Sequence, residues 1–137
     1  MPDLTPTTGR PRILLVEDDA SVRRSLQLLL RSQNYDVRAY GSGQSLSEDP
    51  EALKADCLVA DLCMPDTNGV TLLKELRAVG WQGPAILISG QLDEAWKALA
   101  RSGGFANIFE KPLSDNVLVA AVRKLVRQPQ TGCAPAA

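Results

Sequence analysis

Three runs of mostly apolar residues constrain the fold of this 137-residue chain more than any other feature. They are RILLV at 12–16, CLVA at 57–60 and PAILIS at 84–89. None of the three alternates apolar and polar residues, so each fits a strand that is buried on both faces. Strands of this kind are typical of a parallel sheet that helices cover on both sides.

Segments with helical periodicity lie between these runs and after the last of them. Their apolar residues recur at the spacing of an amphipathic helix, and Ser114 can cap the last one. We expect helices at about 20–33, 43–48, 68–79, 92–102 and 114–125. Two weaker patterns, YDVRAY at 35–40 and FANIF at 105–109, predict further strands. Five strands alternating with five helices predict an α/β protein with a five-stranded parallel sheet.

The charge balance and the first residues restrict the class of function. The net charge is −1, and no run of Lys or Arg offers a surface for nucleic acid. No apolar stretch approaches the length of a membrane span, and no apolar core of a secretory signal is present. We therefore expect a cytoplasmic domain at 12–127 that contacts neither nucleic acid nor membrane. Residues 1–11 are predicted to be a disordered lead, and 128–137 a flexible tail.

The chain contains no histidine. This excludes Ser-His and Cys-His nucleophile pairs, the usual zinc sites and a phosphohistidine donor. The three cysteines, Cys57, Cys63 and Cys133, form no CxxC pair, so we interpret them as free thiols in a reducing compartment. Any chemistry must therefore use carboxylates, lysine, hydroxyls or thiols.

Polar side chains collect at the carboxyl ends of the predicted strands. Glu17 and Asp18 follow the first strand, Asp61 ends the third, Ser89 ends the fourth and Lys111 follows the fifth. Ligands of open α/β sheets bind beyond this edge. Three carboxylates that converge are unfavourable unless a cation neutralises them, and hard oxygen ligands suit Mg²⁺. The sequence therefore predicts a magnesium site.

Each of these features has a simpler interpretation on its own. The pair Asp18-Asp19 could cap a helix, Asp61 could cap the loop that follows it, and Ser89-Gly90 could be a turn. Lys111-Pro112 is an ordinary loop dipeptide. Their common position at the same end of successive strands favours a shared site.

Four motifs together resemble the receiver domain of two-component response regulators, a phosphoacceptor module like the chemotaxis regulators. They are LLVEDD at 14–19, VADLCMPDTNG at 59–69, ILISG at 86–90 and FEKPL at 109–113. The resemblance extends over residues from about 12 to 127, and the order and spacing of the motifs carry it. It implies a flavodoxin-like three-layer sandwich with strand order 2-1-3-4-5.

The resemblance also implies a role for each acid. Asp61 would accept the phosphoryl group from a histidine kinase or a histidine phosphotransfer protein. Glu17, Asp18 and Asp61 would bind Mg²⁺ together with the backbone carbonyl of Cys63. Asp66 and Asn68, which follow closely in the chain, we interpret as turn and helix-cap residues.

Other positions would bind the phosphoryl group and transmit its presence. Ser89 and Lys111 would contact it, and the small Gly90 would leave it accessible. The family usually has an aromatic switch residue where this chain has Ile108, with Phe109 beside it. Phosphorylation would change partner binding at the face of the fourth helix, fifth strand and fifth helix. The downstream protein is not identified, and a phosphorylation-dependent homodimer stays open.

The residues two positions beyond Asp61 and Ser89 flank the phosphoryl group in this family, and here they are Cys63 and Gln91. Gln91 could orient a hydrolytic water and so set the lifetime of the phosphorylated state.

A phosphatase with an aspartyl nucleophile commonly carries an acid at the position of Cys63. We therefore expect no turnover of external substrates.

Two alternatives remain to be compared with this interpretation. GSGQSL at 41–46 could suggest a nucleotide-binding loop, but Leu46 replaces the third glycine and the motif follows the second strand. A receiver-like scaffold without phosphorylation is the other, although the acids, Ser89 and Lys111 are all present. Whether the domain stands alone or belongs to a longer regulator is left open.

Overall fold

Five parallel strands form one sheet in the order β2-β1-β3-β4-β5. The strands are β1 (Arg12–Val16), β2 (Asp36–Tyr40), β3 (Cys57–Asp61), β4 (Ala85–Ser89) and β5 (Asn107–Glu110). The computed structural model describes residues 10–126, so the predicted tail, Cys133 and nearly all of the predicted lead lie outside it. The predicted fold class and strand order are confirmed.

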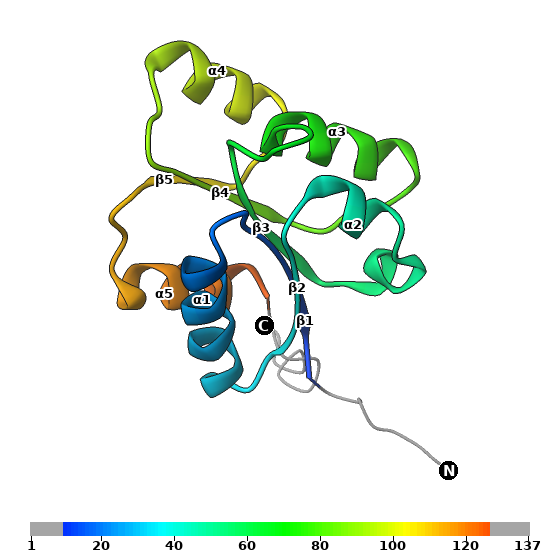
Figure 1. Cartoon of the computed structure of the whole chain (residues 1–137), viewed down its shortest axis with the longest axis vertical. Coiled ribbons are helices and arrows are strands. Elements are labelled where there is room, and N and C mark those ends of the chain that lie inside the picture. The colour runs from blue at the N-terminus through cyan, green and yellow to red at the C-terminus, as the bar shows by residue number, and fades with distance from the viewer. Residues whose placement is uncertain (1–9, 127–137) are drawn as a thin grey trace, which may run out of the picture.

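Helices cover both faces of this sheet, as Figure 1 shows. They are α1 (Ala20–Ser32), α2 (Gly43–Ser47), the 3₁₀ helix η1 (Pro50–Lys54), α3 (Gly69–Ala78), α4 (Glu94–Ser102) and α5 (Asp115–Leu125). Helices α1 and α5 lie on one side of the sheet, and α2, α3 and α4 lie on the other (Figure 1). No helix within residues 10–126 combines the length and the apolar character that crossing a membrane requires.

The apolar strands bury both of their faces, as their composition predicts. In β1, Leu14 and Val16 pack in the core under α2, α3 and α4, whereas Ile13 and Leu15 pack in the core under α1 and α5. All four are at most 1% exposed. Successive side chains of a strand point to opposite faces, so a run without polar residues supplies two cores at once.

The predicted ends of the elements are close to the observed ones. Ser114 caps α5 by accepting a hydrogen bond from the Val117 N–H, as expected. Strand β5 begins at Asn107, two residues later than the predicted FANIF strand. Phe105 is buried in the core beside α4, and the Ala106 N–H donates to Ala85 before the regular ladder starts. These residues lead into the strand and are not part of it.

Candidate functional site

The carboxyl ends of β1 and β3 bring three acidic side chains together. These two strands are neighbours, and Glu17 follows the first while Asp61 ends the second. Carboxylate oxygens of Glu17, Asp18 and Asp61 lie within 4.8 Å of one another. Glu17 and Asp61 are buried, and Asp18 is exposed. The buried pair therefore forms the floor of the cluster, and Asp18 faces solvent.

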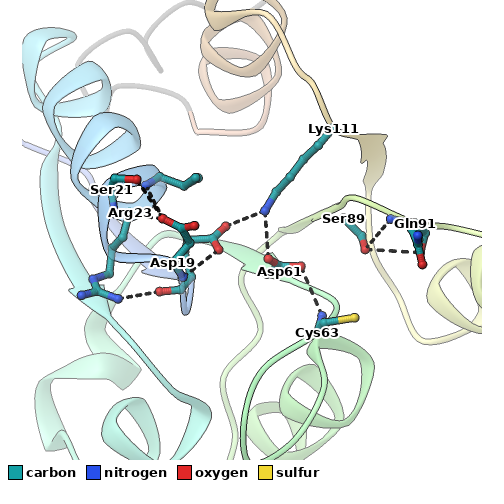
Figure 2. A network of polar contacts seen from close by, with 10 residues as sticks. Asp19, Ser21, Arg23, Asp61, Cys63, Ser89, Gln91 and Lys111 are labelled. Atoms are coloured by element: carbon teal, nitrogen blue, oxygen red, sulfur yellow. Dashed lines mark hydrogen bonds and ion pairs between the residues drawn. The ribbon is translucent and has the colours of Figure 1, made fainter.

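Lys111 bridges the two buried acids. Its ammonium nitrogen lies 2.9 Å from Glu17 Oε1 and 2.9 Å from Asp61 Oδ2. Figure 2 shows the Lys111 side chain crossing the site toward Asp61. The backbone N–H of Lys111 donates to the Ser89 carbonyl at 2.8 Å, which attaches the residue to the end of β4. A side chain from the loop after β5 is thereby held over the ends of β1 and β3.

Burial and pairing act on the pKa values of this cluster in different directions. Burial raises the pKa of Glu17, and the hydrogen bond from Lys111 opposes this shift. Burial lowers the pKa of Lys111, but the hydrogen bonds to Glu17 and Asp61 outweigh it, so the Lys111 pKa is raised. Lys111 is therefore charged at neutral pH and supplies one positive charge to the site.

The second oxygen of Asp61 is held by the chain that follows it. Asp61 Oδ1 accepts a hydrogen bond from the Cys63 N–H at 3.2 Å. The β3–α3 loop, residues 62–68, is closed at its base by a bridge between Cys63 and Asn68 and by the Gly69 N–H, which donates to Leu62. Both Asp61 oxygens thus have a defined partner, so the orientation of the carboxylate is fixed.

Gly69 has to be a glycine at the end of this loop. A Cβ atom there would lie 2.8 Å from the Asp61 carbonyl oxygen and 2.7 Å from a Leu87 methyl group. Neighbouring Asn68 caps α3 by accepting a hydrogen bond from Thr71 at 2.8 Å, as predicted from sequence. The helix can therefore start directly against β3.

The two adjacent acids after Glu17 have different roles. Asp19 caps α1, because its Oδ1 accepts hydrogen bonds from the Ser21 and Val22 N–H groups at 2.9 and 3.1 Å. These contacts, with the one from Val22 foremost, hold the pKa of Asp19 below its usual value. Asp18 instead contributes an oxygen to the acidic cluster. The helix-cap interpretation applies to Asp19 and not to Asp18.

Hydrogen bonds fix both the side chain and the backbone of Glu17. The Asp19 N–H donates to Glu17 Oε2 at 3.1 Å, and Arg23 Nη1 donates to the Glu17 carbonyl at 2.8 Å (Figure 2). The Asp19 and Lys111 contacts together occupy both Glu17 carboxylate oxygens. The first turn of α1 therefore positions the loop that follows β1.

Ser89 is only 1% exposed, and its hydroxyl faces its own loop. It accepts a hydrogen bond from the Gln91 N–H at 3.3 Å and lies 3.4 Å from the Gln91 carbonyl (Figure 2). A Cβ atom at Gly90 would have no neighbour within 4 Å. The Ser89 hydroxyl is thus held by weak contacts beside an open position.

Cys63 and Gln91 line one cavity of about 640 Å³ next to the acidic cluster. Both residues are predicted to flank the phosphoryl group, and they come from different loops of the fold. Met64 and Trp96 also line the cavity. The position of Trp96 is not indicated by sequence, because the helical spacing that places it in α4 does not show which neighbour that helix covers.

Ile108 and Phe109 point to opposite faces of β5. Ile108 packs with the core under α2, α3 and α4, which also includes the partly buried Trp96. Phe109 packs with the core under α1 and α5. Because adjacent strand residues alternate between faces, Phe109 cannot take the place of an aromatic residue at position 108.

The donor set fits a divalent cation. Three carboxylates and one ammonium leave an excess of two negative charges, counting all four groups as ionised. The donors are hard oxygens, and exposed Asp18 gives access from solvent. Mg²⁺ binds through a few carboxylates and keeps part of its hydration. The residues present therefore suit Mg²⁺.

The two described cysteines are expected to differ in reactivity. Burial raises the pKa of Cys57 to about 12, so at about pH 8 roughly one thiol in ten thousand is ionised. Cys63 is exposed. We expect iodoacetamide to label Cys63 in the folded protein and to label Cys57 only after denaturation. Peptide mapping after timed labelling measures this difference, and equal labelling of both thiols in the folded state would contradict the structure.

Comparison with known proteins agrees with this geometry. Residues 13–123 match the model of the response regulator receiver domain family. The chain is 31% identical over 121 residues to the transcriptional regulatory protein FixJ of Bradyrhizobium diazoefficiens, covering 88% of this chain and 59% of that protein. It is 36% identical over 109 residues to FixJ of Azorhizobium caulinodans, covering 80% of this chain and 52% of that protein. The chain thus spans little more than half the length of these relatives.

A solved structure shows the same fold. The chemotaxis protein CheY4 of Vibrio cholerae superposes with a TM-score of 0.78 at 20% identity, over 85% of this chain and 99% of that one. This structural similarity concerns the arrangement of strands and helices, whereas the family match over residues 13–123 includes the motifs at the ends of the strands. This chain belongs to the family of response regulator receiver domains.

Proposed function

We propose that this receiver domain accepts a phosphoryl group on Asp61 from a histidine kinase or a histidine phosphotransfer protein, in a reaction that depends on Mg²⁺. The observation that carries the proposal is the Asp61 carboxylate at the end of β3, 2.9 Å from the Lys111 ammonium and within the acidic cluster. Phosphate acceptance and Mg²⁺ binding at an acidic pocket are general properties of the family to which the chain belongs.

The residues of the chain prepare Asp61 for attack. One Asp61 oxygen forms a bond to phosphorus while the bond from phosphorus to the donor nitrogen breaks, and the imidazole leaves with the electron pair of that bond. The contacts of Asp61 with Lys111 and the Cys63 N–H orient the carboxylate before the donor arrives. Lys111 offsets the negative charge of the transferring oxygens.

Glu17, Asp18, Asp61 and the Cys63 carbonyl would hold Mg²⁺, which when bound supplies positive charge beside the phosphoryl oxygens. The cluster of these residues carries the charge excess described above. Cys63 stands where related phosphatases carry an acid, so the domain has no group there to protonate a leaving alcohol. We therefore propose a phosphoacceptor without turnover of external substrates.

The switch would begin at Ser89. Phosphorylation adds about −1.5 to −2 charge and strong acceptor oxygens at position 61. The Ser89 hydroxyl, which contacts the Gln91 backbone at 3.3 and 3.4 Å, would turn toward this new acceptor. The loop before α4 would follow, and Ile108 would repack beside Trp96 in the same core. The face of α4, β5 and α5 would change with it.

We propose that this face binds a downstream protein in the cytoplasm, or a second copy of the chain after phosphorylation, and that the domain does not contact nucleic acid itself. The relatives described above are named as transcriptional regulatory proteins, and the chain spans little more than half of their length. The basic and acidic residues of this chain balance to a net charge of −1, which gives no support for a nucleic-acid surface.

Replacing Gln91 tests how the phosphorylated state is lost. Gln91 is exposed and lines the cavity beside the site, where its amide can orient an attacking water. Gln91→Ala is expected to lengthen the lifetime of the phosphorylated protein several-fold, as followed by intact mass after the donor is removed. Gln82→Ala, an exposed glutamine between α3 and β4, is the matched control. An unchanged lifetime for Gln91→Ala would rule out this role.

The proposed function is tested by incubating the protein with acetyl phosphate and Mg²⁺ and recording its intact mass and the phosphate released. A single phosphate adduct with slow release supports a phosphoacceptor. Sustained release at enzymatic rates would indicate a phosphatase. No adduct from acetyl phosphate or from a kinase would indicate a scaffold.

A further inference from the structure

The β2–α2 turn, Gly41 to Gln44, contains the motif that could suggest a nucleotide-binding loop. Two of its backbone N–H groups instead bind a carboxylate of the protein itself. The Gly43 N–H donates to Asp66 Oδ1 at 3.2 Å, and the Gln44 N–H donates to Asp66 Oδ2 at 2.7 Å. Both oxygens of one carboxylate are therefore used to join two loops that are separated by 22 residues or more in the chain.

The two loops are also in close van der Waals contact. A Cβ atom at Gly43 would lie 2.6 Å from the Thr67 methyl group, and Gly43 is buried. Only glycine fits this approach without displacing Thr67. The tip of the β3–α3 loop thus packs directly on the first residue of α2, and Asp66 secures the contact.

This contact matters for the acidic site because of what the loop contains. Cys63 lies in the same loop, and its N–H orients Asp61 Oδ1. Its carbonyl is the ligand that we assign to Mg²⁺. The loop is fixed at its base by the bridge from Cys63 to Asn68 and at its tip by Asp66. Cys63 is therefore part of the attachment at the base, three residues before the attachment at the tip.

We propose that Asp66 is a positioning residue of the acidic site, which sets the Cys63 backbone relative to Asp61 by clamping the β3–α3 loop to the N-terminal residues of α2. This role rests on the proposed Mg²⁺-dependent function. Asp66 is an exposed residue and not a member of the acidic cluster. It acts through the loop, as the outer partners of metal ligands do.

A role limited to holding α2 in place has different consequences. In that case the loss of the carboxylate would lower the melting temperature and leave Mg²⁺ binding as it was. A positioning role predicts a change in Mg²⁺ affinity, because a ligand that is free to move binds less well. The two roles are separated by measuring affinity and stability on the same variants.

The experiment compares the full chain with Asp66→Ala, Asp66→Asn and Glu48→Gln. The asparagine keeps one acceptor oxygen for the two N–H groups. Glu48→Gln is the matched control, because Glu48 lies at the other end of α2 and accepts a hydrogen bond from the Gln44 side chain, not from the loop backbone. Mg²⁺ affinity is measured calorimetrically on the unphosphorylated proteins. The Mg²⁺ dependence of phosphorylation by acetyl phosphate is measured in parallel.

Asp66→Ala is expected to weaken Mg²⁺ binding by about tenfold, the lower end of the range for outer partners of metal ligands. The Mg²⁺ concentration for half-maximal phosphorylation is expected to rise by the same factor, with little change in the rate at saturating Mg²⁺. Asp66→Asn should lie between this variant and the parent, and Glu48→Gln should match the parent. The amide resonances of Gly43 and Gln44 should shift on Mg²⁺ addition in the parent.

Parental Mg²⁺ affinity in both Asp66 variants would overturn the proposal, whatever their melting temperatures. If Asp66→Ala does not fold, the Asp66→Asn variant is used instead, and parental Mg²⁺ affinity in that variant would also overturn the proposal. A parent protein that binds no Mg²⁺ would instead contradict the proposed function, and the role of Asp66 would fall with it. These outcomes are distinct, because only the last concerns the parent.

Discussion

Asp61→Asn is expected to accept no phosphate from acetyl phosphate under conditions that phosphorylate the parent completely. The amide has nearly the shape of the carboxylate, so the packing at the end of β3 is kept, but its oxygen is not a nucleophile. The amide oxygen can accept a hydrogen bond from Lys111 or from the Cys63 N–H. The carboxylate uses a different oxygen for each of these donors, and the amide has only one oxygen in their place. Intact mass spectrometry measures the loss.

Glu110→Gln is the matched control for this variant. Glu110 ends β5 at the same edge of the sheet, is exposed and lines the cavity beside the site, so the variant makes the same charge change nearby. We expect it to be phosphorylated like the parent. A full-size adduct on Asp61→Asn would mean that another residue is the acceptor.

Lys111→Met is expected to lower the rate of phosphorylation by about a hundredfold at saturating Mg²⁺, the usual cost of losing one charge-stabilising donor. Lys111 is the ammonium in contact with Asp61, at 2.9 Å, and methionine keeps most of its apolar length. Lys97→Met is the control, because Lys97 pairs with Glu94 on α4 at 3.5 Å, away from the acidic cluster. A Lys111 variant with the parental rate would exclude this role.

The same substitution is expected to destabilise the fold in the absence of Mg²⁺. It leaves the buried carboxylates of Glu17 and Asp61 without their cation, and breaking such a pair costs about 3 kcal/mol. Burial already raises the pKa of Glu17, and the loss of Lys111 removes the largest of the contacts that oppose this shift. An acid whose folded pKa is raised stabilises the fold at low pH and loses that contribution as the pH rises.

The destabilisation of Lys111→Met is therefore expected to be smaller at about pH 5 than at about pH 7.5. Urea unfolding of parent and variant at the two pH values, with EDTA present, measures the difference. Added Mg²⁺ should restore part of the stability at the higher pH. A destabilisation that is the same at both pH values would contradict the charge explanation.

Much of the fold could be predicted because its signals are local. The apolar runs of β1, β3 and β4 need burial on both faces, and this requirement alone defines a covered parallel sheet. The acids at the ends of β1 and β3 converge for the same reason, since parallel strands present their carboxyl ends at one edge. Neither inference needs knowledge of the packing between helices.

What sequence did not reveal depends on contacts between loops. The neighbours of Asp66 in the chain indicate a turn residue. Its hydrogen bonds to Gly43 and Gln44 exist only because α2 lies beside the β3–α3 loop. Trp96 faces the cavity for a similar reason. The division of roles between Asp18 and Asp19 depends on where α1 begins, to a precision of one residue. Sequence patterns do not reach that precision.

The central claim is that Asp61 is the residue that takes the phosphoryl group. The most direct measurement is to incubate the parent with acetyl phosphate and either Mg²⁺ or EDTA, reduce the product with borohydride and sequence its peptides by mass spectrometry. Borohydride converts an aspartyl phosphate to homoserine and so marks the acceptor. We predict homoserine at position 61 in the Mg²⁺ sample and unmodified Asp61 in the EDTA sample. Unmodified Asp61 in both samples, with phosphate on another residue or on none, would contradict the account.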